Sequence, residues 1–235
     1  MKRRLDQILS SFDYCSRKEA RDWCRAGRVE VQGEIVRDVA YKAEPRDLLI
    51  DGEPIDHPDG ILIMLHKPLG HVCSHDSAEG VRIYDLLPDE WLYRDPQPVS
   101  VGRLDRDTSG LILVTDETAL VHRLTSPKHK VAKTYQVRVD KPLRDELIAA
   151  FAAGTLMLEG EKSACLPAEL RIVDELHAEL AITEGKYHQV RRMFAAFDYH
   201  VETLHRSQVG GLTLGDLEPG EWRDLDDEDR ALLGL

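Results

Sequence analysis

The sequence of 235 residues is poor in positive charge, in cysteine and in long apolar runs. Its 31 Lys and Arg residues are outnumbered by 43 Asp and Glu, which argues against binding nucleic acid over the whole surface. The longest apolar runs fall short of the roughly 18 residues that a membrane-spanning helix needs, and the N-terminus does not resemble a secretory signal. The four cysteines are scattered without C-x-x-C spacing, which predicts reduced thiols in a cytoplasmic protein.

The basic residues that are present gather in three segments, 1–28, 118–139 and 185–197. The second segment, which includes Lys128, and the third contain no acidic residue at all. Since local charge matters more than the net charge of −12, nucleic-acid binding through these segments stays open. A hydrophobic content of 42% with 31% charged residues indicates a globular chain with a true core.

The first 55 residues have the pattern of a small unit with two helices and a sheet. Leu5, Ile8 and Leu9 have helical spacing. A capping-box pattern, Ser16 to Glu19, predicts the start of a second helix that ends at Gly27. Short strands are predicted at 29–31, 35–36 and 48–50. Four arginines share one face of the second helix and its end, at positions 17, 21, 25 and 28.

This N-terminal pattern resembles the S4 RNA-binding domain. The blocks that carry the resemblance are Leu5-Asp-Gln-Ile-Leu9, Ser16-Arg-Lys-Glu-Ala20 and Gly27 to Val36. The resemblance implies that the basic helix lies on structured RNA. The turn-rich stretch 56–60 indicates a linker, so we expect an S4 domain at 1–57 and a second domain at 58–235. The RNA contacts implied in the first domain are Arg3, Arg17, Lys18, Arg21, Arg25 and Arg28.

The rest of the chain has more predicted strands than helices. Apolar runs at 61–65, 99–104 and 111–114 predict buried strands, and alternating patterns at 133–139 and 177–182 predict half-buried ones. Helices are predicted at 117–125, 142–153 and 189–197, with a strand at 200–206. Because strands and helices do not alternate regularly, we predict an α+β domain on a mixed, mainly antiparallel sheet.

The segment Gly102-Arg-Leu-Asp-Arg-Asp-Thr-Ser-Gly110, between two apolar strands, is the strongest candidate for chemistry. Three readings remain open from its residues alone. It can be a surface hairpin built on turn-forming residues. It can be a metal loop, since Asp105-x-Asp107-x-Ser109 imitates part of a calcium site or of a Mg²⁺-dependent phosphatase. It can also present an aspartate nucleophile that attacks a sugar carbon and works without metal.

Four blocks in order resemble the motifs of pseudouridine synthases, specifically the RsuA-like group that acts on bacterial rRNA. They are His66-Lys-Pro-Leu-Gly70, Gly102 to Asp116, Lys133-Thr-Tyr135 and Glu184-Gly-Lys-Tyr-His-Gln-Val-Arg-Arg-Met-Phe194. The resemblance implies that Asp105 is the catalytic aspartate, that Arg191 pairs with it, and that Tyr135 stacks on a flipped uracil. It further implies substrate or RNA contacts at Lys67, Arg103, Thr108, Ser109, Lys133, His188, Gln189 and Arg192.

The resemblance also implies the reaction, isomerisation of a uridine to pseudouridine, for which no cofactor or metal is expected. Tyr187-His188 and the tail from Val209 are closer to the small-subunit enzymes, which favours 16S rRNA and the uridine equivalent to position 516 of their substrate. The alternatives are a 23S rRNA synthase of the same family and a non-catalytic S4 assembly factor. We expect a cytoplasmic monomer acting on rRNA, either free or in a ribosomal assembly particle.

Overall fold

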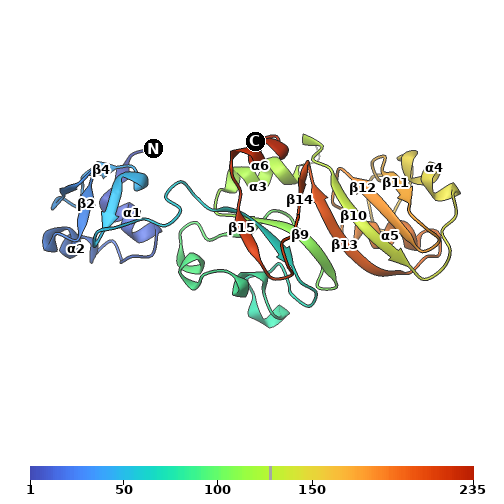
Figure 1. The fold of residues 1–235 in the computed structure, drawn as a ribbon, viewed down its shortest axis with the longest axis horizontal. Helices are drawn as coiled ribbons and strands as arrows, with labels where there is room; N and C mark the ends of the chain where they lie inside the picture. The colour runs from blue at the N-terminus through green and yellow to red at the C-terminus, as the bar shows by residue number, and fades with distance from the viewer. Residues whose placement is uncertain (127–128) are drawn as a thin grey trace. The chain divides into compact units, whose positions relative to one another are not determined.

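The structure is a computed structural model that describes residues 1–126 and 129–235, so Lys128 lies outside the described residues. The chain forms two compact units, coloured along the sequence in Figure 1. The N-terminal unit comprises Met1–Leu62, Leu87–Val99 and Thr115–Glu117, and the large unit comprises the remainder. The expected domain boundary between residues 57 and 58 stays a prediction.

The N-terminal unit combines two short helices with a four-stranded antiparallel sheet of order β3-β2-β5-β6 and a two-stranded pair, β1-β4. Strands β2 and β5 coincide with the predicted strands at 29–31 and 48–50. Its elements are β1 (Arg3–Arg4), α1 (Leu5–Ser11), α2 (Ala20–Ala26), β2 (Val29–Val31), β3 (Glu34–Ile35), β4 (Lys42–Ala43), η1 (Pro45–Asp47), β5 (Leu48–Ile50), β6 (Glu53–Pro54) and η4 (Asp89–Tyr93).

Local chemistry sets the ends of α2. The Glu19 carboxylate accepts hydrogen bonds from the Ser16 amide at 3.0 Å and the Ser16 hydroxyl at 2.6 Å, which forms the predicted capping box. Gly27 ends the helix with φ of +78°, a left-handed conformation that glycine adopts without strain. Between these ends, Ala20 and Cys24 are buried against Leu5 and Leu9 of α1.

The segment Leu87–Val99 belongs to the N-terminal unit although it lies far from it in sequence. The Trp91 indole donates to the Asp56 carboxylate at 2.6 Å, and the Asp95 amide donates to the Ser11 carbonyl at 2.9 Å. The buried Arg94 guanidinium lies over the Phe12 ring, 4.5 Å from its centroid, and 3.3 Å from Asp116. Burial lowers the pKa of Arg94, and the nearby carboxylates oppose that shift. This segment therefore covers Phe12 and Asp56 of the N-terminal unit.

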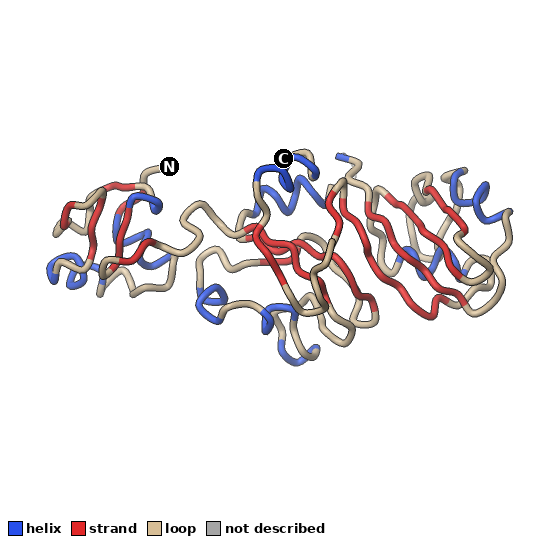
Figure 2. Tube along the Cα trace, in the orientation of Figure 1, coloured by secondary structure: helices blue, strands red, loops and turns tan. Residues whose placement is uncertain are grey.

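The large unit is built on a nine-stranded sheet, drawn in red in Figure 2. The strand path is β11-β12-β10-β13-β9-β7-β15, with β14 on β13 and β8 on β9. Its elements are β7 (Leu62–Lys67), η2 (Ser77–Glu79), η3 (Ile83–Leu86), β8 (Val99–Ser100), β9 (Thr108–Thr115), α3 (Thr118–Thr125), β10 (Lys133–Val139), α4 (Glu146–Ala152), β11 (Glu169–Ile172), β12 (His177–Ile182), α5 (Gln189–Ala195), β13 (Val201–Val209), β14 (Leu212–Thr213), β15 (Trp222–Asp224) and α6 (Asp227–Leu232).

The strand directions confirm the predicted α+β class with a mixed, mainly antiparallel sheet. β10 pairs antiparallel with β12 and β13, whereas β13 runs parallel to β9. The predicted strand at 99–104 is shorter than expected, because β8 ends at Ser100 and Gly102 turns the chain with φ of +74°. Within the described residues, no helix has the length and apolarity to cross a bilayer.

Aromatic packing joins α5 to α4 in the large unit. The rings of Phe194 on α5 and Phe151 on α4 meet edge to face with centroids 5.3 Å apart, and both residues are buried. Met193 and Val190 are buried on the same helix. The residues just before α5 thereby gain a rigid support.

Candidate active site

Asp105 lies in the loop between β8 and β9, three residues before β9 begins. The Thr108 amide donates to the Asp105 carbonyl at 3.0 Å and closes the turn. β9 then runs parallel beside β13, with Thr108 opposite Leu204. The Asp105 side chain is 33% exposed, so its carboxylate is held by the loop yet open to solvent.

The start of β9 depends on a close approach between backbones. A Cβ atom on Gly110 would overlap the backbone carbonyl of Arg206 on β13, and Gly110 has φ of +114°. Arg206 is buried, and its Nε donates to the Leu111 carbonyl at 2.7 Å. The glycine of the predicted catalytic motif thus seats this loop against β13.

Lys67 lies beneath the loop rather than facing substrate. Its side chain is fully buried, and its ammonium donates to the Thr108 carbonyl at 2.7 Å and to the Pro68 carbonyl at 3.1 Å. Burial lowers the pKa of Lys67, while the charges of Asp105 and Asp107 oppose the shift. In this structure the lysine at the end of β7 supports the loop from inside, and its RNA contact stays a prediction.

Thr108 is likewise buried, and its predicted RNA contact stays a prediction. The side chain is 1% exposed, since Thr108 begins β9 in the interior of the sheet. Its hydroxyl is buried and has no hydrogen-bond partner among the described residues. Ser109 points differently, and its hydroxyl lies 2.9 Å from Nδ1 of His205. Burial and the neighbouring His66 lower the pKa of His205, which favours a neutral ring at this contact.

His188, not Arg191, contacts the Asp105 carboxylate. Nε2 of His188 lies 3.1 Å from Oδ1 of Asp105. His188 immediately precedes α5 and has φ of +47°, an uncommon conformation for a residue with a side chain. Its ring stacks on the ring of Tyr187 with centroids 3.8 Å apart and an interplanar angle of 19°.

Arg191 binds the second aspartate of the loop instead of the first. Its Nη2 lies 2.8 Å from Oδ2 of Asp107, and its Nη1 donates to the Val201 carbonyl at 2.8 Å. The structure thus places the guanidinium of Arg191 on Asp107, two residues after Asp105, and the pairing of Arg191 with Asp105 stays a prediction. Arg191 links the loop to β13 and so positions Asp105 indirectly.

The remaining polar residues of the Glu184–Phe194 block hold the chain around α5. Gln189 is 4% exposed, accepts a hydrogen bond from the Lys186 amide at 2.8 Å and donates to Glu184 at 2.8 Å. Gln189 is thus engaged inside the fold, and its RNA contact stays a prediction. Arg192 donates to Glu161 and to the Tyr187 carbonyl, both at 2.9 Å, which ties the loop around residue 161 to this block.

Tyr135 lies on β10, next to the strand that seats the loop. It pairs with Leu180 on β12 and with Arg206 on β13, the residue that faces Gly110 of β9. The side chain is 7% exposed. Tyr135 and Asp105 are thus carried by elements on either side of β13, as expected for residues that share a site.

Lys133, two residues before Tyr135, is partly buried. Burial, together with the charge of Arg206, lowers the pKa of Lys133 to about 8. Its ammonium donates to the Val131 carbonyl at 3.2 Å. Arg103, in contrast, is 74% exposed and only 4.0 Å from Glu79 in a loose ion pair. Both side chains remain available to a ligand.

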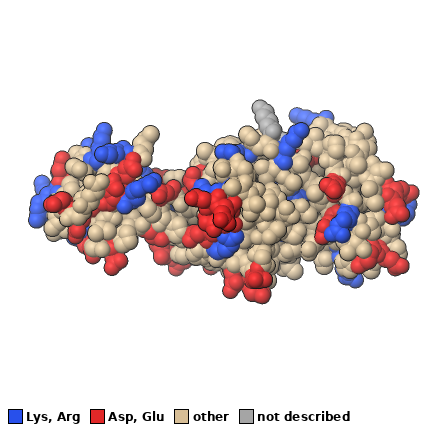
Figure 3. Space-filling model, turned by 45° about the horizontal axis from the view of Figure 1, so that its top comes forward, with Lys and Arg blue, Asp and Glu red and all other residues tan. Residues whose placement is uncertain are grey.

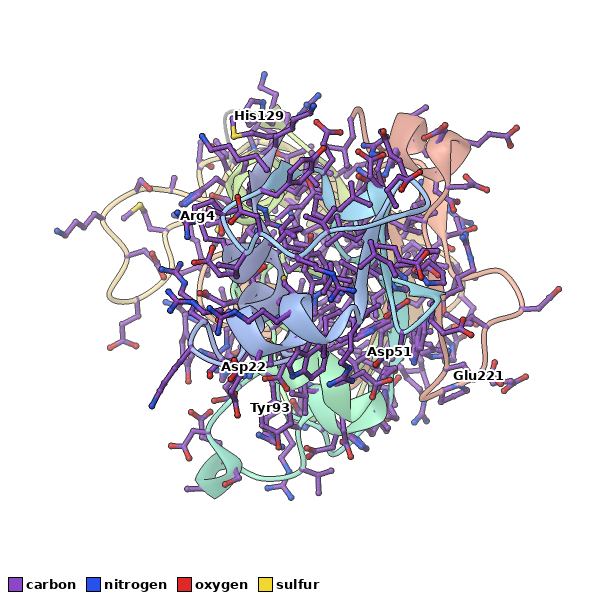
Figure 4. All side chains as sticks on the ribbon, turned by 90° about the vertical axis from the view of Figure 1, so that its left-hand side faces the viewer. Arg4, Asp22, Asp51, Tyr93, His129 and Glu221 are labelled. Atoms are coloured by element: carbon purple, nitrogen blue, oxygen red, sulfur yellow. The ribbon has the colours of Figure 1, made fainter. Side chains whose placement is uncertain are left out.

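The basic residues of α2 lie on the surface of the N-terminal unit. Figure 3 shows Lys and Arg atoms exposed there, with Asp and Glu among them, and Figure 4 labels Asp22 on α2 and Asp51. Arg28 donates to Asp51 at 2.8 Å and lies 3.4 Å over the Trp23 ring, while Arg3 donates to Ser11 at 3.2 Å. The fully exposed members of the predicted set are Arg17, Lys18, Arg21 and Arg25.

The role of His188 at Asp105 was missed by sequence reasoning, which placed this histidine against RNA. The unusual Tyr-His pair before Gln189 was visible, but which carboxylate the ring would meet depends on the left-handed turn at His188. Within residues 1–126 and 129–235, no three His, Cys, Asp or Glu side chains come together as a group that could hold a metal ion.

Comparison with known proteins identifies the two parts of the chain. Residues 61–196 match the RNA pseudouridylate synthase family, and residues 3–49 match the S4 domain. The chain is 42% identical over 233 residues to ribosomal small subunit pseudouridine synthase A of Escherichia coli (strain K12), covering 97% of this chain and 98% of the relative. The ribosomal small subunit pseudouridine synthase A of Yersinia pestis is 41% identical to this chain, with 98% of each chain covered.

A solved structure agrees with these matches. The crystal structure of a pseudouridylate synthase aligns with a TM-score of 0.69 and 38% sequence identity, covering 98% of this chain and 99% of the other. The likeness therefore extends over both units and includes the loop that carries Asp105. The chain belongs to the RNA pseudouridylate synthase family, whose members are isomerases, and it carries an S4 domain at its N-terminus.

Proposed function

We propose that this protein isomerises one specific uridine of 16S rRNA to pseudouridine, with Asp105 as the nucleophile and without a cofactor. The choice of the small-subunit RNA rests on the relatives named ribosomal small subunit pseudouridine synthase A, which align over nearly the whole chain. Ribosomal RNA, free or in an assembly particle, is then the partner, and the cytoplasm is the place of action. We propose that the protein acts as a monomer.

The observation that carries the proposal is the different surroundings of the two aspartates in the loop. Asp107 is engaged by Arg191 through both its carboxylate and its carbonyl. Asp105 is contacted by His188 at Oδ1, and among the described residues no donor reaches Oδ2. A nucleophile needs one oxygen free and a neighbour that keeps the other oriented, and only Asp105 meets both requirements.

The reaction rearranges bonds within one nucleotide. The bond between N1 of uracil and C1′ of the ribose breaks, a bond between C5 and C1′ forms, C5 loses its proton and N1 gains one. The Asp105 carboxylate forms a transient bond either to C1′ or to C6, and leaves again as the new C–C bond forms or the proton departs. Because the product is an isomer, the reaction consumes neither an oxidant nor a group donor.

The base must leave the RNA fold to reach Asp105, which requires flipping. We propose that Tyr135 stacks on the flipped uracil near the C5 proton, and that Lys133 and the exposed Arg103 contact the RNA backbone around it. We propose that Ser109 and Arg192 line the site that receives the flipped base. The basic surface of α2 supplies further phosphate contacts.

The test is pseudouridine mapping by carbodiimide modification and primer extension, on 16S and 23S rRNA from cells that lack the gene. Complementation with the wild type should restore one stop in 16S rRNA. Asp105→Asn should restore none, because loss of a covalent nucleophile lowers the rate by more than about 1,000-fold. Asp174→Asn is the matched control, because it changes an exposed aspartate in the turn between β11 and β12, and it should behave as the wild type.

Each other outcome has a definite meaning. A stop restored in 23S rRNA would keep the chemistry and overturn the 16S assignment. Full restoration by Asp105→Asn would overturn the nucleophile. Absence of any restored stop would overturn the enzymatic proposal for rRNA in favour of an S4-containing assembly factor.

A further inference from the structure

Tyr187 is an exposed aromatic residue beside the nucleophile. Its side chain is 74% exposed, while the ring of His188, stacked on it, reaches Asp105. Exposed aromatic rings in RNA-modifying proteins offer a flat surface on which a nucleobase can stack. The inner face of Tyr187 is already covered by His188, so its outer face is the one offered to a ligand.

The backbone that carries these two rings is fixed from both sides. The Tyr187 carbonyl accepts a hydrogen bond from Arg192 at 2.9 Å, and the His188 carbonyl accepts one from the Arg192 amide at 3.0 Å. The Lys186 ammonium donates to Ser163 at 3.1 Å, and its amide donates to Gln189. Movement of the rings is therefore confined to their side-chain torsions, so a shift of one stacked ring is transmitted to the other.

The far end of this stack sets the direction of the Asp105 carboxylate. Nε2 of His188 lies 3.1 Å from Oδ1 of Asp105, within the distance of an ion pair. A partner at one oxygen restrains rotation of the carboxylate and leaves Oδ2 open. The charged groups that adjoin this pair are Lys67 below the loop and Asp107, which is neutralised by Arg191.

From this chain of contacts we propose that Tyr187 and His188 couple RNA binding to the aim of the nucleophile. Tyr187 takes a nucleobase that flanks the target uridine on its outer face, and His188 acts as the positioning residue that holds Asp105 Oδ1. Base stacking on Tyr187 holds the His188 ring in place, so the nucleophile is aimed when the correct strand is bound. The inference rests on the proposed function of Asp105 and adds a flanking-base contact and a positioning role to it.

The ligand is a nucleobase of single-stranded or locally unpaired RNA. Stacking on an aromatic ring changes affinity by about tenfold per base and depends little on which base it is. The target uracil itself is assigned to Tyr135, on β10, so the base on Tyr187 is a neighbour in the same strand. This arrangement explains why an exposed tyrosine directly precedes the residue that touches the nucleophile.

The experiment separates binding from chemistry with a 16S rRNA fragment tritiated at C5 of uridine. Single-turnover tritium release and filter binding are measured for the whole protein. Tyr187→Ala should weaken RNA binding about tenfold, whereas Tyr187→Phe should bind as the wild type, because the ring is kept. His188→Ala should lower the rate at saturating RNA by about 30-fold with little change in affinity, and His188→Gln, which keeps a donor, should recover most of it.

Two further variants complete the test. The control His177→Ala removes a histidine from an exposed pair with Asp174 and should change neither quantity. Combining Tyr187→Ala with His188→Ala should lower the rate no further than His188→Ala alone, since both act through one contact. Rates that multiply instead, or His188→Gln as slow as His188→Ala, would overturn the coupling.

Binding in the Asp105→Asn background distinguishes this inference from the proposed function. Asp105→Asn with Tyr187→Ala should still bind RNA about tenfold more weakly than Asp105→Asn alone. Equal affinities would overturn the role of Tyr187 whatever the activity of the wild type. Absence of tritium release by the wild type would instead count against the proposed function.

Discussion

The basic residues of the two units have opposite surroundings. In the N-terminal unit the charges of α2 are exposed, with Arg17, Lys18, Arg21 and Arg25 open to solvent. In the large unit several basic residues of the motifs turn inward: Lys67 and Arg206 are buried on backbone carbonyls, and Arg191 and Arg192 are engaged by acidic side chains and carbonyls. The first set is placed to meet a polyanion, and the second set holds the loop of Asp105 in shape.

This difference explains how an acidic chain can handle RNA. A net charge of −12 does not repel the ligand where Arg17 and Lys18 precede α2 and Arg21 and Arg25 lie on it, all four exposed. It also shows that a basic residue of these motifs can be bound inside the fold, as Lys67 is. Three experiments sharpen or break the contrast.

The largest effect is expected from the buried lysine. Lys67→Ala leaves a cavity and two buried carbonyls, of Thr108 and Pro68, without their donor, so we expect a loss of about 3 kcal/mol in the free energy of unfolding. Lys18→Ala, at an exposed position, should stay within about 0.5 kcal/mol of the wild type. Urea denaturation measures both. Equal stabilities of the two variants would break the contrast.

An intermediate effect is expected from the exposed arginines. Arg21→Gln combined with Arg25→Gln should weaken RNA binding about tenfold at physiological salt, and should reduce the slope of log K against log salt by about 1.4 to 1.8. Stability should change little because both side chains are exposed. The matched control is the double change of Arg144 and Arg171 to Gln, two exposed arginines paired with glutamates. A control that weakens binding equally would show that only total charge matters.

The smallest effect concerns Lys133, which lies between the two classes. With a pKa lowered from 10.5 to about 8, its ammonium is charged below pH 8 and neutral above it. RNA affinity should therefore fall about threefold more between pH 7 and 9 in the wild type than in Lys133→Arg, whose guanidinium stays charged. Filter binding across this range is the measurement. Parallel pH profiles would exclude Lys133 from the RNA contacts.

The same shift acts on folding in the opposite direction. Between pH 8 and 10.5 the folded protein holds Lys133 neutral while the unfolded chain holds it charged. The unfolded state then binds more protons, so the contribution of Lys133 to stability rises with pH over this window. As pH rises, the RNA affinity that Lys133 contributes should fall while its contribution to stability rises. This distinguishes Lys133 from the exposed arginines of α2.

Sequence patterns predicted elements better than they predicted partners. The strands at 29–31 and 48–50 were predicted correctly, and the end of α2 followed from Gly27. The two-residue strands β1 and β4 have too few residues for any periodicity. Element position therefore follows from local pattern wherever an element spans enough residues to show one.

The site shows where such prediction ends. Asp105, Tyr135 and the α5 block could be proposed from the sequence because their motifs are contiguous. Whether Arg191 meets Asp105 or Asp107 depends on a displacement of one short turn, which residue types do not encode. In the same way, Lys67 and Gln189 are polar residues whose partners lie inside, and their burial became visible only with the packing of β7 and α5.

The cover that Trp91 and Arg94 give to Asp56 and Phe12 has a consequence for gene fusion. A fragment of residues 1–57 fused to another protein would lack Trp91 and Arg94. The Phe12 ring and the Asp56 carboxylate would then be exposed without these partners. The portable piece would have to include segments from three separate stretches of the gene. Recombination at the linker is thus a poor way to exchange this RNA-binding region, because residues 87–99 and 115–117 would stay behind.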